Sequence, residues 1–212
     1  MLAKVLTIAQ QKGGAGKTTL TAQIAVAFAA AGRRVALIDV DPQASLSRWY
    51  KVRTERPSDG LPPLTLSEVP GWKLATEIDR LKHSSDLLLI DSPPHAETEA
   101  KVAVRCAALV LVPVQPSPMD LWATAPTVAL AKAASVPILV VLNRVQARSK
   151  LVETARKRLA EDGLPVARTA LGNRMPFAAS MLEGRSVVEA SPKSVAASEI
   201  RSLAEEIEGL LA

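Results

Sequence analysis

Residues 12–19 of this chain are Lys-Gly-Gly-Ala-Gly-Lys-Thr-Thr, and this stretch limits the possible fold more than any other. Its three glycines let the backbone adopt conformations that other residues avoid, so successive N–H groups can form one concave nest for anionic oxygens. An apolar run, residues 3–9, precedes the stretch, and Leu20, Ile24 and Phe28 follow it at helical spacing. The first turn of a helix carries unpaired N–H groups that favour phosphate. The order of strand, glycine loop and helix therefore predicts a phosphate-binding loop.

Two side chains of this loop suit a nucleotide held with magnesium. We expect Lys17 to reach the β- and γ-phosphates as a point charge, and the Thr18 hydroxyl to enter the coordination shell of Mg²⁺. An incidental glycine turn is the alternative, which the strand and helix on either side disfavour. The predicted nucleotide-binding residues of the loop are Gly13, Gly14, Ala15, Gly16, Lys17, Thr18 and Thr19.

The loop departs from the common GxxxxGK[ST] pattern, because Gln11 replaces the first glycine and Lys12 adds a second lysine. This form resembles the deviant Walker A motif of the ParA/MinD class of ATPases. Three later segments resemble blocks of that class in order and spacing. Residues 35–43 (VALIDVDPQ) resemble its second strand and switch I, residues 87–94 (LLLIDSPP) its Walker B strand and switch II, and residues 110–118 (VLVPVQPSP) its proline-rich loop. In size and layout the chain is most similar to the small ParA partition proteins, which lack an N-terminal DNA-reading domain.

Alternating apolar runs and helical periods predict an α/β fold, a three-layer sandwich around a mainly parallel twisted sheet. The resemblance implies the P-loop NTPase version of this fold. A length of 212 residues suits a single domain, 1–212. Residues 44–51 are predicted as a short helix, 53–63 as a surface loop, 64–69 as an edge strand and 165–169 as the last strand. The terminal helix is predicted to begin near Ser194.

Acidic side chains follow the apolar strands, at the ends where an open parallel sheet binds its ligands. By resemblance, Asp41 orients the attacking water, and Asp39 is assigned to the waters around magnesium. A carboxylate in a plain turn is the alternative for each. Asp91 closes an apolar strand, where a carboxylate is costly unless it meets a cation. We therefore assign Asp91 to the outer shell of magnesium.

The resemblance also assigns a role to Lys12. In the ParA/MinD class this lysine crosses the dimer interface to the partner's nucleotide, so ATP occupancy is coupled to homodimer formation; a solvated lysine is the alternative. Asn143 and Arg144 resemble the class's adenine-contacting positions, although a strand-end turn explains them equally well. His95 is interpreted as a loop histidine rather than a catalytic base. The predicted catalytic residues are Lys12, Lys17 and Asp41.

Basic residues exceed acidic ones by 26 to 21 over the whole chain, and the excess is concentrated between residues 144 and 174. Eight basic residues stand there against three acids. They are Arg144, Arg148, Lys150, Arg156, Lys157, Arg158, Arg168 and Arg174. Small ParA proteins bind DNA without sequence preference in the ATP-bound dimer, and such binding is electrostatic and salt-sensitive. A solvated helix face is the alternative interpretation.

Together these features predict a weak Mg-dependent ATPase with ATP and Mg²⁺ as cofactors. It would act as a homodimer on non-specific DNA and position a plasmid, a chromosome locus or a protein cluster, stimulated by a ParB-like or cargo-adaptor protein. The alternative is a MinD-like membrane-cycling ATPase, but residues 199–212 contain four glutamates against Arg201, which an anionic membrane would repel. An iron–sulfur electron-transfer relative conflicts with the single Cys106, and an amide-forming cobyrinate enzyme needs additional substrate-binding sequence that a compact chain of 212 residues hardly accommodates. A regulatory ATPase without DNA binding stays open. We expect a cytoplasmic protein, associated with the nucleoid in the ATP state and not with a membrane.

Overall fold

The computed structural model describes residues 2–55, 60–94 and 97–212, so the predicted loop histidine, His95, lies outside the described residues. Six strands form one sheet in the order β3-β2-β4-β1-β5-β6, and every neighbouring pair is parallel. The strands are β1 (Lys4–Ile8), β2 (Val35–Asp39), β3 (Leu64–Glu68), β4 (Leu87–Asp91), β5 (Leu109–Val114) and β6 (Ile138–Leu142). The predicted α/β fold is confirmed, and its sheet is parallel throughout these strands.

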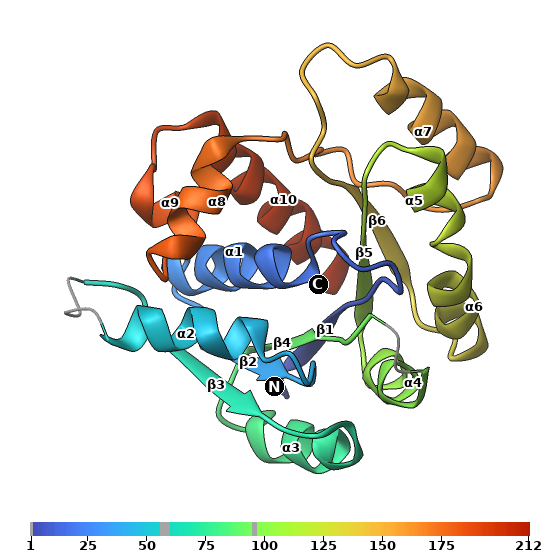
Figure 1. The fold of residues 1–212 in the computed structure, drawn as a ribbon. Coiled ribbons are helices and arrows are strands. Elements are labelled where there is room, and N and C mark those ends of the chain that lie inside the picture. Colours follow the sequence, from blue (N-terminus) through green and yellow to red (C-terminus); the bar gives the residue numbers. More distant parts are fainter. Residues whose placement is uncertain (1, 56–59, 95–96) are drawn as a thin grey trace.

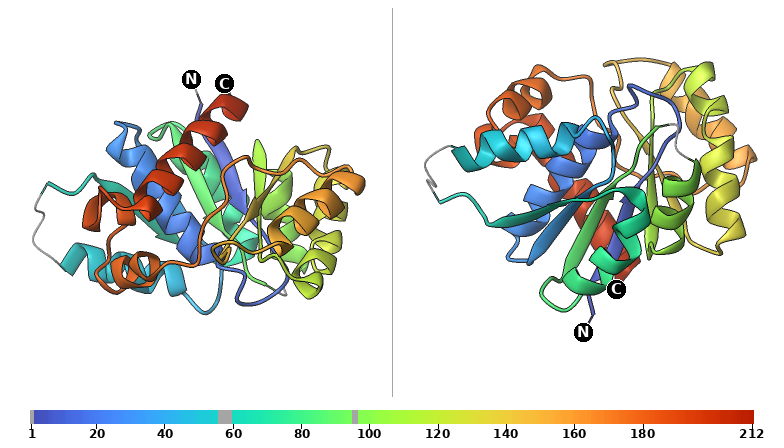
Figure 2. Two further views of the ribbon diagram at one scale, coloured as in Figure 1. Left: turned by 90° about the horizontal axis from the view of Figure 1, so that it is seen from above. Right: turned by 60° about the horizontal axis from the view of Figure 1, so that its bottom comes forward.

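Helices cover both faces of the sheet, which gives the expected three layers (Figures 1 and 2). The helices are α1 (Lys17–Ala30), α2 (Ser45–Glu55), α3 (Leu74–Leu81), α4 (Glu97–Arg105), α5 (Pro118–Trp122), α6 (Ala125–Ala133), α7 (Leu151–Glu161), α8 (Met175–Leu182), α9 (Val187–Ala190) and α10 (Val195–Leu211), with a 3-10 turn at Gly71–Lys73. Helices α1, α2, α9 and α10 pack on one face, and α3, α4, α6 and α7 pack on the other.

Alternation along the strands divides the core between these two faces. Leu37 and Leu89 point toward α1, whereas Ile38 and Ile90 point toward α3 and α4, and all four side chains are fully buried. Because successive strand side chains face opposite sides, a continuous apolar strand needs cover on both. Helix α1 is buried along most of its length between the sheet and α10. This explains why its residues are apolar or small on nearly all sides.

Several predicted boundaries differ from the structure. Residues 165–169 form only an isolated bridge between Val140 and Val166 instead of a strand, and Pro165 has no N–H to donate to a ladder. Helix α2 continues through Arg53, which was expected to begin the loop, because Glu189 and the Gly184 carbonyl hold its guanidinium. Helices α8 and α9 form in a region for which no element was predicted. None of the helices that the structure describes has the length and apolarity needed to cross a bilayer.

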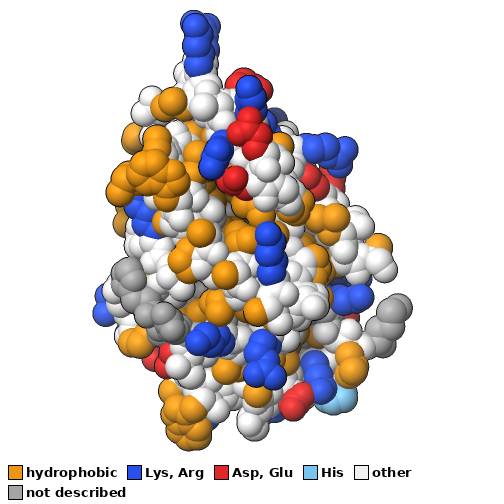
Figure 3. Space-filling model, turned by 90° about the vertical axis from the view of Figure 1, so that its right-hand side faces the viewer, with side chains coloured by type: hydrophobic (Ala, Val, Ile, Leu, Met, Phe, Trp, Pro, Cys, Tyr) orange, Lys and Arg blue, Asp and Glu red, His pale blue; other side chains and the backbone are white. Residues whose placement is uncertain are grey.

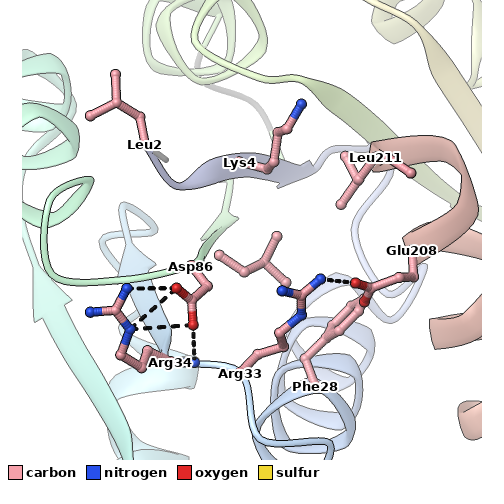
Figure 4. A pocket seen from close by; sticks show the side chains of 10 residues that line it. Leu2, Lys4, Phe28, Arg33, Arg34, Asp86, Glu208 and Leu211 are labelled. Carbon is pink, nitrogen blue, oxygen red and sulfur yellow. Dashed lines mark hydrogen bonds and ion pairs between the residues drawn. The ribbon is translucent and has the colours of Figure 1, made fainter.

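Ion pairs lie at the amino ends of the strands, before β2 and β4 (Figure 4). Arg34 donates to both carboxylate oxygens of Asp86, at 2.6 Å for the shortest contact, and Arg33 pairs with Glu208 of α10. The side-chain and backbone hydrogen bonds from Arg34 lower the pKa of Asp86 to about 2. These pairs line a cavity of about 430 Å³ near both ends of the described chain. Strand polarity places this cavity at the end of the sheet away from the glycine loop.

Candidate nucleotide site

The glycine loop joins β1 to α1 at the carboxyl edge of the sheet, where the sequence predicted it. Gly14 and Gly16 have φ angles of 77° and 92°, in the left-handed region that favours glycine. Space also requires glycine at position 16, since a Cβ atom there would lie 2.5 Å from Nδ2 of Asn143. The same Asn143 amide donates to the Ala15 carbonyl at 2.9 Å. The end of β6 therefore fixes the loop against the start of α1.

Arg144 also acts on the loop. Its guanidinium donates to the Gly14 carbonyl at 3.1 Å, and Gln115, at the end of β5, donates to the same oxygen at 3.3 Å. Arg144 itself adopts a φ of 52°, and its N–H is bonded to the side-chain oxygen of Asn143. Asn143 and Arg144 thus position the phosphate loop in this structure, and their predicted contact with adenine stays a prediction.

Lys17 is buried at the start of α1, with 7% of the residue exposed. Its ammonium donates to the Gln10 carbonyl at 3.0 Å, which leaves two of its three donors for another acceptor. Burial lowers the pKa of Lys17, and the nearby carboxylates of Asp91 and Asp41 oppose that shift. A buried ammonium with spare donors is suited to bind an anion.

Thr18 and Asp91 lie together next to Lys17. The Thr18 hydroxyl donates to Oδ2 of Asp91 at 2.6 Å, and the Thr21 hydroxyl approaches the other oxygen at 3.5 Å. Burial raises the pKa of Asp91 to about 7, with the charges of Asp39 and Asp41 adding to the shift while Thr18 and Lys17 oppose it. A cation at this point would favour the ionised carboxylate.

These oxygens fit a magnesium ion in their chemistry. Hydroxyl and carboxylate oxygens are the ligands of hard cations, and Mg²⁺ generally keeps several waters and substrate phosphates alongside one or two protein ligands. Within the described residues, no group of three or more His, Cys, Asp or Glu side chains could enclose a metal by itself. The pair of Thr18 and Asp91 therefore suits Mg²⁺ that arrives with a nucleotide better than a resident metal.

Asp39 and Asp41 occupy different surroundings, although both follow β2. Asp39 lies beside Asp91 in the sheet register, is 1% exposed, and accepts from the N–H and the hydroxyl of Ser47 at 2.9 and 2.8 Å. Its carboxylate therefore anchors the first turn of α2, and its predicted contact with the waters around magnesium stays a prediction. Asp41 is half-buried and accepts from the Gln43 N–H at 2.9 Å. The carboxylate of Asp41 is thus the more accessible of the two to a ligand or water.

Lys12 has a different partner from Lys17 in this structure. Its ammonium lies 2.6 Å from Oδ2 of Asp120 in the first turn of α5. Asp120 was not predicted as a site residue, although a serine followed three residues later by an acid, Ser117 and Asp120, resembles a helix-capping pattern. Position alone does not test the predicted role of Lys12 in a dimer.

A cavity of about 410 Å³ opens beside the loop, between the end of β6 and α8. Gly16, Thr19 and Leu20 line it from the loop and α1, and Asn173 and Phe177 line it from α8 and the segment before that helix. Amide groups can bond the edge of a nucleobase and an aromatic ring can stack on its face. Asn173 and Phe177 were missed because no element was predicted between residues 170 and 193.

The family follows from a direct comparison. Residues 6–187 match the model of the CobQ/CobB/MinD/ParA nucleotide binding domain. The chain belongs to this family. One curated relative is the maintenance of carboxysome distribution protein A (McdA) of Halothiobacillus neapolitanus, 30% identical over 220 residues, which cover 97% of this chain and 94% of the relative. Another is the chromosome-partitioning ATPase Soj of Thermus thermophilus, 29% identical over 234 residues, which cover 95% and 94%.

Solved structures of MinD have the same fold. The cell division ATPase MinD of Pyrococcus furiosus superposes with a TM-score of 0.83 at 26% identity, over 99% of this chain and all of that one. MinD of Pyrococcus horikoshii, solved with Mg-ADP, gives 0.81 at 25% identity, over 100% and 99%. The predicted ParA/MinD class and P-loop NTPase fold are therefore confirmed. The predicted cofactors, ATP and Mg²⁺, agree with the magnesium-bound adenine nucleotide, Mg-ADP, in the second MinD structure.

Proposed function

We propose that the protein is a weak Mg-dependent ATPase that hydrolyses ATP to ADP and phosphate and works as a homodimeric positioning switch. The observation that carries this proposal is the arrangement of Lys17, Thr18 and Asp91 around the glycine loop. Cation, hydroxyl and carboxylate converge there on one point at the carboxyl edge of the sheet. The relatives named as ATPases, Soj and MinD, support the same reaction.

Each residue has a task in phosphoryl transfer to water, which depends on positioning and electrostatics more than on covalent chemistry. Lys17 binds the β- and γ-phosphates, and Thr18 and Asp91 hold the magnesium ion, directly or through water. When bound, Mg²⁺ neutralises the charge on the phosphates. Asp41 orients the attacking water, and Asp39 keeps the start of α2, and with it the segment of Asp41, in place. Lys12 reaches the nucleotide of a second copy, which makes the ATP-bound dimer the active state.

Non-specific DNA is the proposed matrix for this dimer, and exposed basic side chains without a partner in the chain are the proposed contacts. Five of the eight basic residues between 144 and 174 contact partners within the chain: Arg144, Arg156, Arg158, Arg168 and Arg174. Of the eight, all of which the structure describes, Arg148, Lys150 and Lys157 are exposed, and their side chains form no ion pair or hydrogen bond with the described residues. Lys and Arg side chains are spread among hydrophobic ones on the face viewed in Figure 3. We infer that the exposed side chains of Arg148, Lys150 and Lys157 contact the phosphates of the DNA backbone.

The membrane alternative has less support. Helix α10 is amphipathic, but its apolar residues Ile200, Leu203 and Ile207 are fully buried against α1 and the sheet. Glu199 and Glu206 on its polar side bind Arg174 and the backbone near Arg168. A membrane anchor needs an apolar helix face free to enter the lipid. The apolar face of α10 is instead packed in the core of the protein.

We propose only the kind of cargo that the protein positions. Relatives named for carboxysome distribution and for chromosome partitioning point to a protein cluster or a DNA locus, with a plasmid as a third possibility. A ParB-like or cargo-adaptor protein would then accelerate hydrolysis. The protein would work in the cytoplasm and associate with the nucleoid while ATP is bound.

Nucleotide binding and hydrolysis test the enzymatic part. Lys17→Ala should abolish binding of a fluorescent ATP analogue, because the buried cation for the phosphates is lost. Asp41→Ala should retain binding but lose hydrolysis, measured as phosphate release. Hydrolysis at the wild-type rate in Asp41→Ala would show that another group orients the water.

DNA binding is tested with a duplex of arbitrary sequence, with ADP or ATP, at several salt concentrations. Wild-type protein should bind only with ATP, and its affinity should fall as salt rises. Arg148→Gln with Lys150→Gln should lower the slope of log K against log salt by roughly one unit per lost phosphate contact. Arg158→Gln is the matched control, since Glu161 and Asp162 already neutralise Arg158. An equal effect of the control would contradict the assignment.

A further inference from the structure

Gln10 is a buried glutamine at the base of the glycine loop, two residues after the end of β1. Only 2% of the residue is exposed, and its backbone carbonyl accepts from the Lys17 ammonium at 3.0 Å. Its side-chain amide nitrogen and oxygen are both buried without a hydrogen-bond partner among the described residues. Burial of an amide in this way is costly, because the group leaves water and gains no other partner. Gln10 therefore needs a reason other than stability.

Gln23 of α1 is buried to the same degree, with 1% exposed, but its amide is bonded. Its nitrogen donates to the Ser180 hydroxyl at 3.0 Å, and its oxygen accepts from the Ser186 hydroxyl at 2.7 Å and from the Val187 N–H at 2.8 Å. Buried polar groups are bonded in this way in most proteins. Of these two glutamines, Gln10 is the one that departs from the rule.

The Gln10 side chain lines a cavity of about 10 Å³ behind the glycine loop. Ser92 and Pro93, which follow β4, line the same cavity, and Thr127 lines it from α6. A space of this size is close to that of one water molecule. A small displacement of the segment after β4, residues 92–94, would therefore bring its backbone to the Gln10 amide.

This segment has acceptors to spare but few donors. Ser92 donates both its N–H and its hydroxyl to the Ile8 carbonyl, at 3.3 and 2.8 Å, and Pro93 and Pro94 have no N–H. The amide nitrogen of glutamine offers two donors. The Gln10 amide is thus the chemical complement of a backbone that presents carbonyl groups alone at its two prolines.

The nucleotide site is directly connected to the same segment. Asp91, whose carboxylate accepts from the Thr18 hydroxyl at 2.6 Å, lies two residues before Pro93. Magnesium and the γ-phosphate, bound as proposed above, would act on this end of β4. Their arrival can therefore move residues 92–94, which face Gln10.

We propose that Gln10 is a positioning residue for hydrolysis, whose amide donates to a backbone carbonyl of residues 92–94 when ATP and Mg²⁺ are bound. This inference rests on the proposed function for the effect of the nucleotide, whereas the unpaired amide is independent of it. The cost of burying the amide unpaired favours the ATP-bound arrangement, in which it is paired. Because the Gln10 carbonyl also holds Lys17, one residue then joins the phosphate-binding lysine to the segment after β4.

Thermal unfolding without nucleotide tests the unpaired amide. Gln10→Met keeps the approximate volume of the side chain and removes both polar atoms, so it should raise the Tm. Gln23→Met is the matched control and should lower the Tm, because it leaves the partners of Gln23 unbonded. A lower Tm for Gln10→Met would show that the amide is already bonded without nucleotide and would overturn the proposal.

Kinetics separate positioning from binding. Gln10→Met should lower kcat for phosphate release about tenfold or more and leave the Kd of a fluorescent ATP analogue within about twofold. Thr127→Val, which alters the same cavity at nearly constant volume, should keep the wild-type kcat. A wild-type kcat in Gln10→Met, or an equal loss in Thr127→Val, overturns the role of Gln10 alone. A wild-type protein that releases no phosphate from bound ATP contradicts the proposed function itself.

Hydrogen exchange gives a readout that does not depend on hydrolysis. A slowly hydrolysed ATP analogue with Mg²⁺ should slow exchange in α4 of the wild type, because α4 follows residues 92–94 and lines the cavity with Ala100 and Val104. Gln10→Met should lose most of this protection and retain that of the first turns of α1, which bind the phosphates. Equal protection of α4 in both proteins would overturn the proposal, whereas an unprotected α1 in wild type would contradict the proposed nucleotide site.

Discussion

Three alanine substitutions in the glycine loop should have graded effects on stability. Gly16→Ala forces a side chain into a φ of 92°, at a cost of about 1–2 kcal/mol. Its Cβ atom would also displace the Asn143 amide, which lies 2.5 Å away, and break the bond to the Ala15 carbonyl, for about 1 kcal/mol more. The sum is about 2–3 kcal/mol. For a chain of this length that corresponds to a Tm lower by roughly 5–10 °C.

The neighbouring glycines separate backbone strain from the clash. Gly14 has a φ of 77° but open space around its Cβ position, so Gly14→Ala should cost about 1–2 kcal/mol. Gly13 has neither constraint, and Gly13→Ala should be neutral or stabilise slightly, because alanine restricts the unfolded chain. Urea unfolding of nucleotide-free protein measures all three. Adding Asn143→Ala to Gly16→Ala should cost less than the sum of the two single changes, because the clash disappears.

Equal destabilisation by the three substitutions would contradict the loop geometry described above. It would mean that the loop does not adopt the described backbone in solution before a nucleotide binds. A Gly16→Ala protein as stable as wild type would likewise contradict the close approach of Asn143.

Two further predictions concern ion pairs away from the loop. Arg53→Met should lower the free energy of unfolding by about 3–5 kcal/mol, because it leaves Glu189 buried without its cation. Lys51→Met, on the exposed side of the same helix, is the control and should change the free energy of unfolding by less than about 0.5 kcal/mol in the same urea titration. Asp86→Asn should lower the Tm near neutral pH. Arg34 lowers the pKa of Asp86 to about 2, so the stabilisation by this pair is present above the ordinary carboxyl pKa and is lost as pH falls from about 4 to 2. The Tm difference between Asp86→Asn and wild type should therefore shrink over that pH range. A constant Tm difference would contradict the pairing.

The parts of this structure that sequence predicted are those with a local signal. The glycine loop, the apolar strands and the start of the terminal helix near Ser194 each carry their information within a few residues. In the structure Ser194 caps this helix by accepting from the Ala197 N–H. The position of Asp91 at the end of β4 followed from the same local pattern. The convergence of these parts at one edge followed from the rule that parallel strands end together.

The missed features depend on contacts between distant residues. Asp120 pairs with Lys12 across 108 residues, and Ser47 holds Asp39 through the first turn of α2. Helix α8 lacks a clear polar face, with Met175 and Leu182 exposed at its two ends, so its sequence gives no period to recognise. These features depend on tertiary packing, and a single sequence does not show which helices and loops will contact one another.

We propose that ATP, and not ADP, joins two copies of this chain. The most direct test is the molar mass of the Asp41→Ala protein by light scattering, with Mg-ATP and with Mg-ADP, because loss of hydrolysis should keep ATP in place. We expect the mass of two chains with ATP and of one chain with ADP. The same mass with both nucleotides, under conditions where each is bound, would show that this protein is not a nucleotide-driven switch.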